Sequence, residues 1–254
     1  MPRILILGGT TEARLLAGRL ADRAGYEITL SLAGRTASPA AQAVPVRIGG
    51  FGGAEGLAGY LLRERIDLLI DATHPYAEVI SANAVEAARR ASVARLVLRR
   101  PPWVAVEGDR WTETGDVSEA VRALGETPRR VFVTLGRNEL LPFTGAPQHH
   151  YLFRSVDPVD PPLPLPHAAY VIGRGPFAES ADHALMTEHR INVVVAKNSG
   201  GTATYGKIAA ARALGLEVIM LRRPRPLEEP SVETVEAAVD FIDHALTSAA
   251  ARGV

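Results

Sequence analysis

The chain has 254 residues, 47% of them hydrophobic and 22% charged, which is enough for one large or two smaller domains with buried cores. Its 28 basic and 28 acidic residues give a formal charge of zero, which argues against a dedicated nucleic-acid or membrane-surface protein. Without cysteine, disulfides, thiolate catalysis and cysteine-ligated metals are excluded, and without a signal-like start or an apolar run near ~20 residues we expect a cytoplasmic protein.

Short apolar runs alternate with amphipathic stretches in the first half of the chain, which is the pattern of βαβ units that build a parallel sheet. The predicted strands cover residues 4–7, 27–32, 46–48, 68–70 and 96–98. The predicted helices cover residues 11–24, 54–65 and 77–91, where small and apolar residues recur every three or four positions. Right-handed crossovers would wind these elements into a Rossmann-like sheet.

A second α/β series follows residue 128. Its predicted strands cover 131–135, 151–156, 170–172, 191–195 and 217–221, and its predicted helices cover 179–188, 205–214 and 232–247. Five prolines between residues 157 and 167 predict an extended loop. We therefore expect an α/β protein with two Rossmann-like lobes of mainly parallel strands and a ligand cleft between them. The N-terminal lobe, residues 1–128, would bind NADP, and residues 129–254 would bind substrate.

A glycine turn ends the first predicted strand, and a helical pattern follows at once. Such a turn lets the backbone approach a pyrophosphate, whose charge the helix N-terminus then stabilises. The turn departs from the full G-x-G-x-x-G pattern because Glu12 and Ala13 stand near the position of the last glycine. A tight strand–helix turn without a ligand is the alternative. The predicted cofactor contacts here are Gly8, Gly9, Thr10, Thr11 and Glu12.

The segment after the second predicted strand favours NADPH over NADH. An acidic residue at this place would bind the ribose 2′-hydroxyl and repel a 2′-phosphate. Here the sequence has an arginine that can pair with a phosphate, flanked by two hydroxyl donors. A solvated loop arginine is the alternative. The predicted contacts are Ser31, Gly34, Arg35 and Thr36.

Polar groups also follow the predicted strand at 68–70, where ligands bind in open α/β sheets. His74 could donate a proton or a hydrogen bond, and Pro75 fixes the turn that directs it. A structural or solvated histidine is the alternative. Thr73 is a further predicted cofactor contact, and Tyr76 is a second candidate proton donor or positioning residue.

Three more segments place cations or N–H donors after predicted strands. Arg137 and Arg174 each lie beside a glycine, an arrangement suited to holding a carboxylate or phosphate. The strand–helix loop from Lys197 to Lys207 is rich in donors but lacks the order of a P-loop. Ordinary surface charge is the alternative interpretation. The candidate donors in this loop are Lys197, Asn198, Ser199, Gly200, Gly201 and Lys207.

The segments 8–14, 71–77, 136–137 and 197–201 together resemble the precorrin-6A reductase family of cobalamin biosynthesis, and the similarity spans nearly the whole chain. The resemblance implies NADPH-dependent hydride transfer to the C18–C19 double bond of precorrin-6A, which gives precorrin-7. Related enzymes of the anaerobic pathway act on the cobalt-bearing macrocycle, so cobalt-precorrin-6A is an alternative substrate. The implied fold is two Rossmann-like lobes with cofactor and substrate between them.

A macrocycle with many acetate and propionate arms needs several separated cations and N–H donors. The candidate cations are Arg14, Arg137, Arg174, Lys197 and Lys207, and His74 and Tyr76 are also candidate substrate contacts. We expect NADPH as cofactor, a corrin-type tetrapyrrole as partner, hand-over of substrate to other corrin-pathway enzymes, and no resident metal.

Two other functions compete with this interpretation. A reductase of small carbonyl compounds would carry a Tyr-x-x-x-Lys pair on a helix, and no such spacing follows Tyr60, Tyr76 or Tyr205. A non-catalytic NADP-sensing protein would bind the cofactor without turnover. The many donors in the second half of the chain exceed what a sensor needs.

Overall fold

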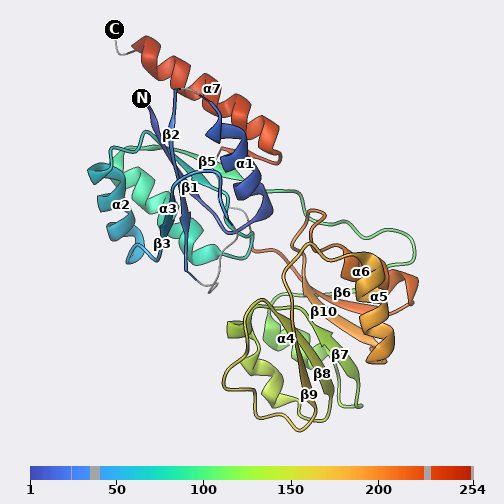
Figure 1. Ribbon diagram of the computed structural model, residues 1–254. Helices are drawn as coiled ribbons and strands as arrows, with labels where there is room; N and C mark the ends of the chain where they lie inside the picture. The colour runs from blue at the N-terminus through green and yellow to red at the C-terminus, as the bar shows by residue number, and fades with distance from the viewer. Residues whose placement is uncertain (24, 35–40, 226–229, 253–254) are drawn as a thin grey trace. The chain divides into compact units, whose positions relative to one another are not determined.

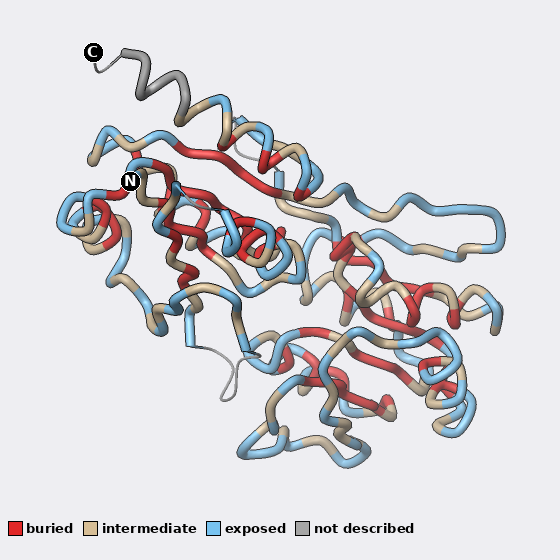
Figure 2. The backbone as a smooth tube through the Cα atoms, turned by 45° about the horizontal axis from the view of Figure 1, so that its top comes forward, coloured by how far each residue is buried: buried red, intermediate tan, exposed pale blue. Residues whose placement is uncertain are grey.

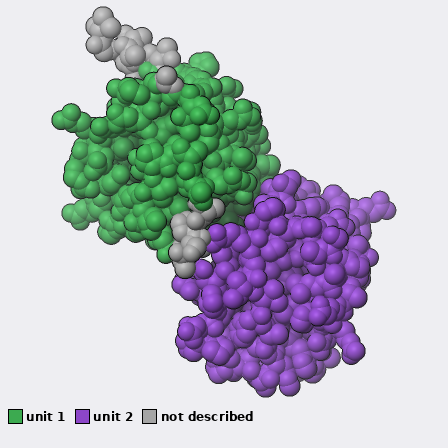
Figure 3. Space-filling view, viewed as in Figure 1, with its two compact units in different colours: residues 1–101, 224–254 green, residues 102–223 purple. Residues whose placement is uncertain are grey.

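The computed structural model describes residues 1–23, 25–34, 41–225 and 230–252. The chain forms two compact units (Figure 3). Unit 1 consists of residues 1–101 and 224–254, and unit 2 consists of residues 102–223. Within these described ranges each unit contains a six-stranded sheet, and the paired strands of both sheets run parallel. The expected α/β class with two Rossmann-like sheets is confirmed.

Unit 1 follows the predicted alternation of strands and helices closely (Figure 1). Its strands are β1 (Arg3–Leu7), β2 (Glu27–Leu32), β3 (Val46–Ile48), β4 (Leu68–Asp71), β5 (Ala94–Leu98) and β12 (Ser231–Val232). Its helices are α1 (Thr11–Ala21), α2 (Gly53–Arg63), α3 (Glu78–Ala91) and α7 (Val235–Arg252). The sheet order is β12-β5-β4-β1-β2-β3, which is the doubly wound order of a Rossmann fold with β12 as the sixth strand.

Alternate residues of the strands in unit 1 face two different helix layers. Ile4 and Ile6 of β1 pack in a core with α1 and α7, whereas Leu5 and Leu7 pack in a second core with α2 and α3. The central strands are thus buried on both faces (Figure 2), as expected for parallel strands that read as continuous apolar runs.

Unit 2 repeats the same plan. Its strands are β6 (Arg110–Thr114), β7 (Arg130–Val133), β8 (His150–Ser155), β9 (Ala168–Ile172), β10 (Val193–Lys197) and β11 (Glu217–Leu221). Its helices are α4 (Val117–Ala123), α5 (Glu179–Glu188) and α6 (Gly206–Ala213), with 3₁₀ turns η1 (Arg137–Glu139) and η2 (Leu141–Gly145). The sheet order β9-β8-β7-β10-β11-β6 is again the doubly wound order, with β7 as first strand and β6 as sixth.

The structure does not divide at residue 128 as the sequence suggested. The second unit begins near Pro102, because β6 pairs with β11. The chain returns to unit 1 near Pro224, where β12 pairs with β5 and Val235, Ala238 and Ile242 of α7 enter the core below β1. The last helix also begins at Val235 rather than at residue 232, since Val232 belongs to β12.

None of the helices in the described ranges is long and apolar enough to cross a membrane.

Candidate functional site

Each sheet has a point where the strand order reverses, and ligands of doubly wound folds bind beyond the carboxyl ends of the strands there. In unit 1 this point lies between β1 and β4, and in unit 2 it lies between β7 and β10. The segments that the sequence singled out follow these four strands or their neighbours.

The turn after β1 needs glycine at two positions for different reasons. A Cβ on Gly8 would lie 2.6 Å from the Cδ1 atom of Leu30, a core residue of β2 that is 1% exposed. The N–H of Gly8 donates to the carbonyl of Ser31 at 2.9 Å, which holds the turn against β2. Gly9 has φ of +114°, a backbone conformation that favours glycine. No atom of the described residues lies within 4 Å of a Cβ built at this position, which leaves open space beside the turn.

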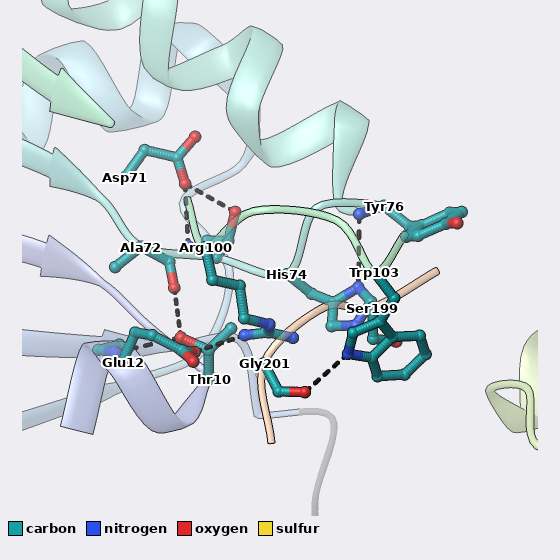
Figure 4. Close-up of polar contacts among 12 residues, drawn as sticks. Thr10, Glu12, Asp71, Ala72, His74, Tyr76, Arg100, Trp103, Ser199 and Gly201 are labelled. Carbon is teal, nitrogen blue, oxygen red and sulfur yellow. Dashed lines mark hydrogen bonds and ion pairs between the residues drawn. The ribbon is translucent and has the colours of Figure 1, made fainter. Parts of the chain in front are cut away.

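Thr10 caps α1 and joins the two strands of the reversal point. Its hydroxyl accepts a hydrogen bond from the N–H of Ala13 at 3.1 Å and donates to the carbonyl of Ala72, after β4, at 2.8 Å (Figure 4). The N–H groups of Thr11 and Glu12 in the first turn have no intrahelical acceptor. Open space beside Gly9 and these N–H groups form the kind of helix terminus that binds anions.

Glu12 forms an ion pair with Arg100, the second residue after β5, and both side chains are largely buried (Figure 4). The pair neutralises the negative charge that the Glu12 carboxylate places in the first turn of α1. The structure therefore gives the Glu12 side chain a partner in the protein, and its expected cofactor contact stays a prediction. Arg100 was not among the candidates from the sequence.

At the end of β2, Ser31 is buried and lies in register with Arg47 of β3. Arg47 places its guanidinium 3.8 Å from the centroid of the Phe51 ring, and it donates to the carbonyls of Gly49 and Gly50 and, at 3.5 Å, to the Ser31 hydroxyl. None of its partners in the described part of the chain is a carboxylate, so its positive charge is not balanced by an ion pair.

Gly34 has φ of +73°, a conformation that favours glycine. The predicted phosphate ligands Arg35 and Thr36 lie outside the described residues.

The segment after β4 forms a compact turn built on Asp71. The buried Asp71 carboxylate accepts hydrogen bonds from the N–H of Thr73 at 3.1 Å and from its hydroxyl at 2.6 Å. Below it, Arg95 of β5 approaches Asp71 to 3.9 Å, and both side chains are almost fully buried. The Thr73 hydroxyl is therefore used inside the turn, which orients the residues that follow.

His74 and Tyr76 lie on this turn with ring centroids 5.6 Å apart (Figure 4). The N–H of Tyr76 donates to Nδ1 of His74 at 3.4 Å, and the N–H of Ala77 donates to the His74 carbonyl at 2.7 Å. With Nδ1 as acceptor, the neutral ring carries its proton on Nε2. The structure thus brings the two candidate proton donors together at the carboxyl edge of the sheet in unit 1.

In unit 2, the reversal point joins the loops after β7 and β10. Lys197 at the end of β10 forms an ion pair with Glu139 of η1. The Lys197 side chain is largely buried, and that of Glu139 is partly exposed. Arg137, at the start of η1, is exposed. A substrate carboxylate at Lys197 would have to compete with Glu139, whereas Arg137 remains open to solvent.

The glycine-rich loop after β10 is held from both sides by residues that the sequence did not indicate. The Asn198 side chain accepts a hydrogen bond from the Trp103 N–H at 2.8 Å and donates one to the Trp103 carbonyl at 2.9 Å. The Trp103 indole donates to the Gly201 carbonyl at 2.7 Å (Figure 4). Arg223 donates to the carbonyls of Asn198 and Ser199 at 2.7 and 2.9 Å. Because the Asn198 amide is used by Trp103, its structural role is to fix the loop.

Gly200 and Gly201 have φ of +66° and +68°, so two successive residues of this loop adopt the left-handed conformation. Lys207 is 3% exposed. Its ammonium donates to the carbonyl of Thr204 at 2.8 Å and lies 5.1 Å from the Trp103 ring centroid. The ammonium of Lys207 thus stabilises the loop, and its expected substrate contact stays a prediction.

The remaining candidate cations, Arg14 on α1 and Arg174 after β9, are exposed. The segment of Arg174 rests on a buried ion pair between Arg154 and Asp182, and the Arg154 guanidinium lies 3.7 Å from the Phe177 ring centroid. Burial lowers the pKa of Arg154, and the charge of Asp182 acts in the opposite direction. The pair therefore fixes the end of β8 below the loop that carries Arg174.

Comparisons with known proteins agree on one family. The family model described as precorrin-6x reductase CbiJ/CobK matches residues 3–243. A precorrin-6A reductase from a Sinorhizobium species is 57% identical over 98% of this chain and 95% of its own length. One from Rhodobacter capsulatus is 50% identical over the full length of both chains. A solved structure titled CobK precorrin-6A reductase is 49% identical, covers 96% of this chain and 97% of its own, and has a TM-score of 0.93. The chain belongs to the precorrin-6x reductase family.

Proposed function

We propose that this chain reduces the C18–C19 double bond of precorrin-6A to give precorrin-7, with NADPH as hydride donor. The observation that carries this proposal is the 57% identity with a precorrin-6A reductase across almost the whole of both chains. We propose that the reversal point in unit 1 binds the dinucleotide and that the one in unit 2 binds the polyanionic macrocycle. The expected cytoplasmic location and the hand-over to other enzymes stay predictions.

The carboxyl edge of the sheet in unit 1 fits a dinucleotide. The open space at Gly9 and the first-turn N–H groups of α1 suit a pyrophosphate. Thr10 holds the turn to Ala72, so that the anion site and the His74 segment keep a fixed geometry. We propose that the dinucleotide extends from Ser31 at one end of this edge to Thr73 at the other.

Arg47 supports a preference for NADPH over NADH. It lies beside Ser31, at the end of β2 where the adenosine ribose binds in this fold class, and no carboxylate of the described chain balances its charge. The two glycine carbonyls and the Phe51 ring fix the guanidinium, so a phosphate would meet it without further ordering. We propose that Arg47 acts here together with Arg35.

The Arg47 proposal is tested by cofactor choice. In Arg47→Gln we expect the ratio of kcat/KM for NADPH to that for NADH to fall about tenfold, while kcat/KM for NADH changes little. Arg63→Gln on α2 is a matched control, since Arg63 is an exposed arginine 5.4 Å from the same Tyr60 ring that Arg47 approaches. An equal loss with both cofactors would show that Arg47 acts only on the fold.

Bound NADPH supplies the hydride, and the chain has to position the acceptor and provide or admit a proton. His74 and Tyr76 are the candidate donors of that proton. We propose that the exposed Arg14, Arg137 and Arg174 contact acetate and propionate arms, with Lys197 exchanging Glu139 for a substrate carboxylate. Ser199, Gly200 and Gly201 would provide backbone and hydroxyl donors beside Lys197.

The deciding experiment incubates purified protein with precorrin-6A and NADPH, with NADH and cobalt-precorrin-6A in parallel reactions, and determines the mass of each macrocycle. A gain of two hydrogens on precorrin-6A with a clear NADPH preference is the expected result. A gain on the cobalt-bearing macrocycle alone would change the substrate. NADPH binding with no gain on either macrocycle would contradict the proposed reaction and favour a sensor.

A further inference from the structure

A cavity of about 200 Å³ opens at the amino edge of the sheet in unit 2. It is lined by the first residues of β7, β8 and β9 and by the end of α5, with Leu152 and Ile191 as part of its apolar wall. The residues proposed above for substrate binding in unit 2 lie at or beyond the carboxyl ends of β7, β9 and β10, at the opposite edge of the same sheet. The cavity is therefore separate from them, and it is smaller than the ~300–1,000 Å³ of typical sites for larger organic ligands.

Four of the five polar side chains that line this cavity are potential cations, namely Arg130, His150, His167 and His189. The fifth, Tyr151, donates its hydroxyl to the carbonyl of Ala146 at 2.8 Å. The rings of His150 and His167 are stacked, with centroids 4.2 Å apart and planes 15° apart. No aspartate or glutamate is among its lining residues in the described part of the chain. Within the described residues, no carboxylate of the lining itself balances positive charge in the cavity.

The guanidinium of Arg130 is held in place through its Nε, and its terminal N–H groups can still donate hydrogen bonds. Its Nε donates to the carbonyl of His189, and the residue's own N–H donates to Asn192 at 3.1 Å. These contacts leave the two terminal amino groups available, and each imidazole can donate at least one N–H. The pKa of His150 lies below its usual value because of burial, the neighbouring His167 and the charge of Arg130.

We propose that this cavity is a binding site for a small oxyanion of the phosphate or carboxylate type. An oxyanion would receive hydrogen bonds from Arg130 and from one or both stacked histidines, and its charge would offset their mutual repulsion. The proposal does not depend on the proposed reductase activity, because it concerns the opposite edge of the sheet.

The experiment follows the histidine imidazole signals of the full-length protein by NMR, without NADPH. Inorganic phosphate and acetate are titrated separately, with sodium chloride at matched ionic strength as reference. We expect saturable shifts of the His150 and His167 signals with phosphate, acetate or both, and the active titrant identifies the class of anion. His244 on α7, outside unit 2, serves as internal reference and should follow the chloride titration.

Two variants test the residues. Arg130→Gln should weaken anion binding at least tenfold, and His167→Gln, at an exposed position, should weaken it severalfold without disturbing the fold. Turnover of precorrin-6A should be unchanged in His167→Gln, which separates this site from the reductase site. The proposal is overturned if neither anion exceeds chloride, or if both variants bind the anion as tightly as the unaltered protein.

Discussion

Glu12 places a carboxylate in the first turn of α1, at the terminus that we propose for the cofactor pyrophosphate. Its ion pair with Arg100 offsets the repulsion that this carboxylate would exert on a phosphate. In Arg100→Gln we expect the Kd for NADPH, measured by fluorescence titration, to rise about tenfold, or ~1.4 kcal/mol. The double variant Glu12→Gln/Arg100→Gln should recover most of the loss. If the double variant stays as weak as the single one, Arg100 contacts the cofactor itself.

For the candidate proton donor His74, the hydrogen bond that holds the turn can be tested separately from proton donation by the ring. His74→Ala should lower kcat about 10²-fold with a small change in KM, since a positioned general acid contributes at least that much. Asn at this position can still accept the hydrogen bond from the Tyr76 N–H but cannot donate from the place of Nε2. His74→Asn should therefore be as slow as His74→Ala. Turnover near that of the unaltered protein in both variants would end the assignment, and Tyr76→Phe would then be measured.

The sequence predicted which segments carry candidate site residues better than it predicted which side chains contact those residues. The positions of Ser31 and His74 follow from local rules, because polar residues after parallel strands meet at one edge of the sheet. Arg47 and Arg100 were missed because their partners are brought near by strand pairing and not by sequence spacing. An arginine inside a short predicted strand was a usable signal for Arg47. The pairing of Asn198 with Trp103 had no comparable signal.

The glycine turn after β1 shows how one element depends on its neighbour. Gly8→Ala would bring a Cβ to 2.6 Å from Leu30, which cannot move because it is enclosed in the core of unit 1. We expect a loss of ~1–3 kcal/mol in the free energy of unfolding, measured with urea. Gly18→Ala, inside α1 with no atom within 4 Å of its new Cβ, should instead gain ~0.5–1 kcal/mol. Equal stability of the two variants would contradict this account.

The elements that the sequence missed lack a buried apolar run. β6 carries the sequence Arg-Trp-Thr-Glu-Thr and is largely exposed at the edge of its sheet, so its pattern is that of a loop. β12 has two residues, too few for any periodicity. α4 spans seven residues and buries only Ala120 fully. Central strands, by contrast, were predicted within one or two residues because both faces of each are buried.

The whole molecule departs from the expected division because the sixth strand of each sheet is far in sequence from the strand with which it pairs, β6 from β11 and β12 from β5. β6 follows the five strands of unit 1 in sequence but pairs in unit 2, and β12 follows the strands of unit 2 but pairs in unit 1. A sequence analysis that assigns neighbouring elements to one domain follows the usual preference for short connections. The edge strands β6 and β12 are exceptions to this preference. A boundary near residue 128 would therefore assign β6 and β12 each to the wrong unit.

This arrangement makes the core of unit 1 depend on the last helix. Ile242 of α7 is fully buried with Ile4, Leu68 and Leu96 of the central strands. Ile242→Ala should therefore cost ~2–5 kcal/mol, and hydrogen exchange should accelerate in peptides of β1, β4 and β5 while those of β7 and β10 keep their rates. Val79→Ala, at a position 76% exposed on α3, is the matched control and should change stability by less than ~0.5 kcal/mol. Faster exchange confined to residues 129–223 would instead place α7 in the second unit, as the sequence had suggested.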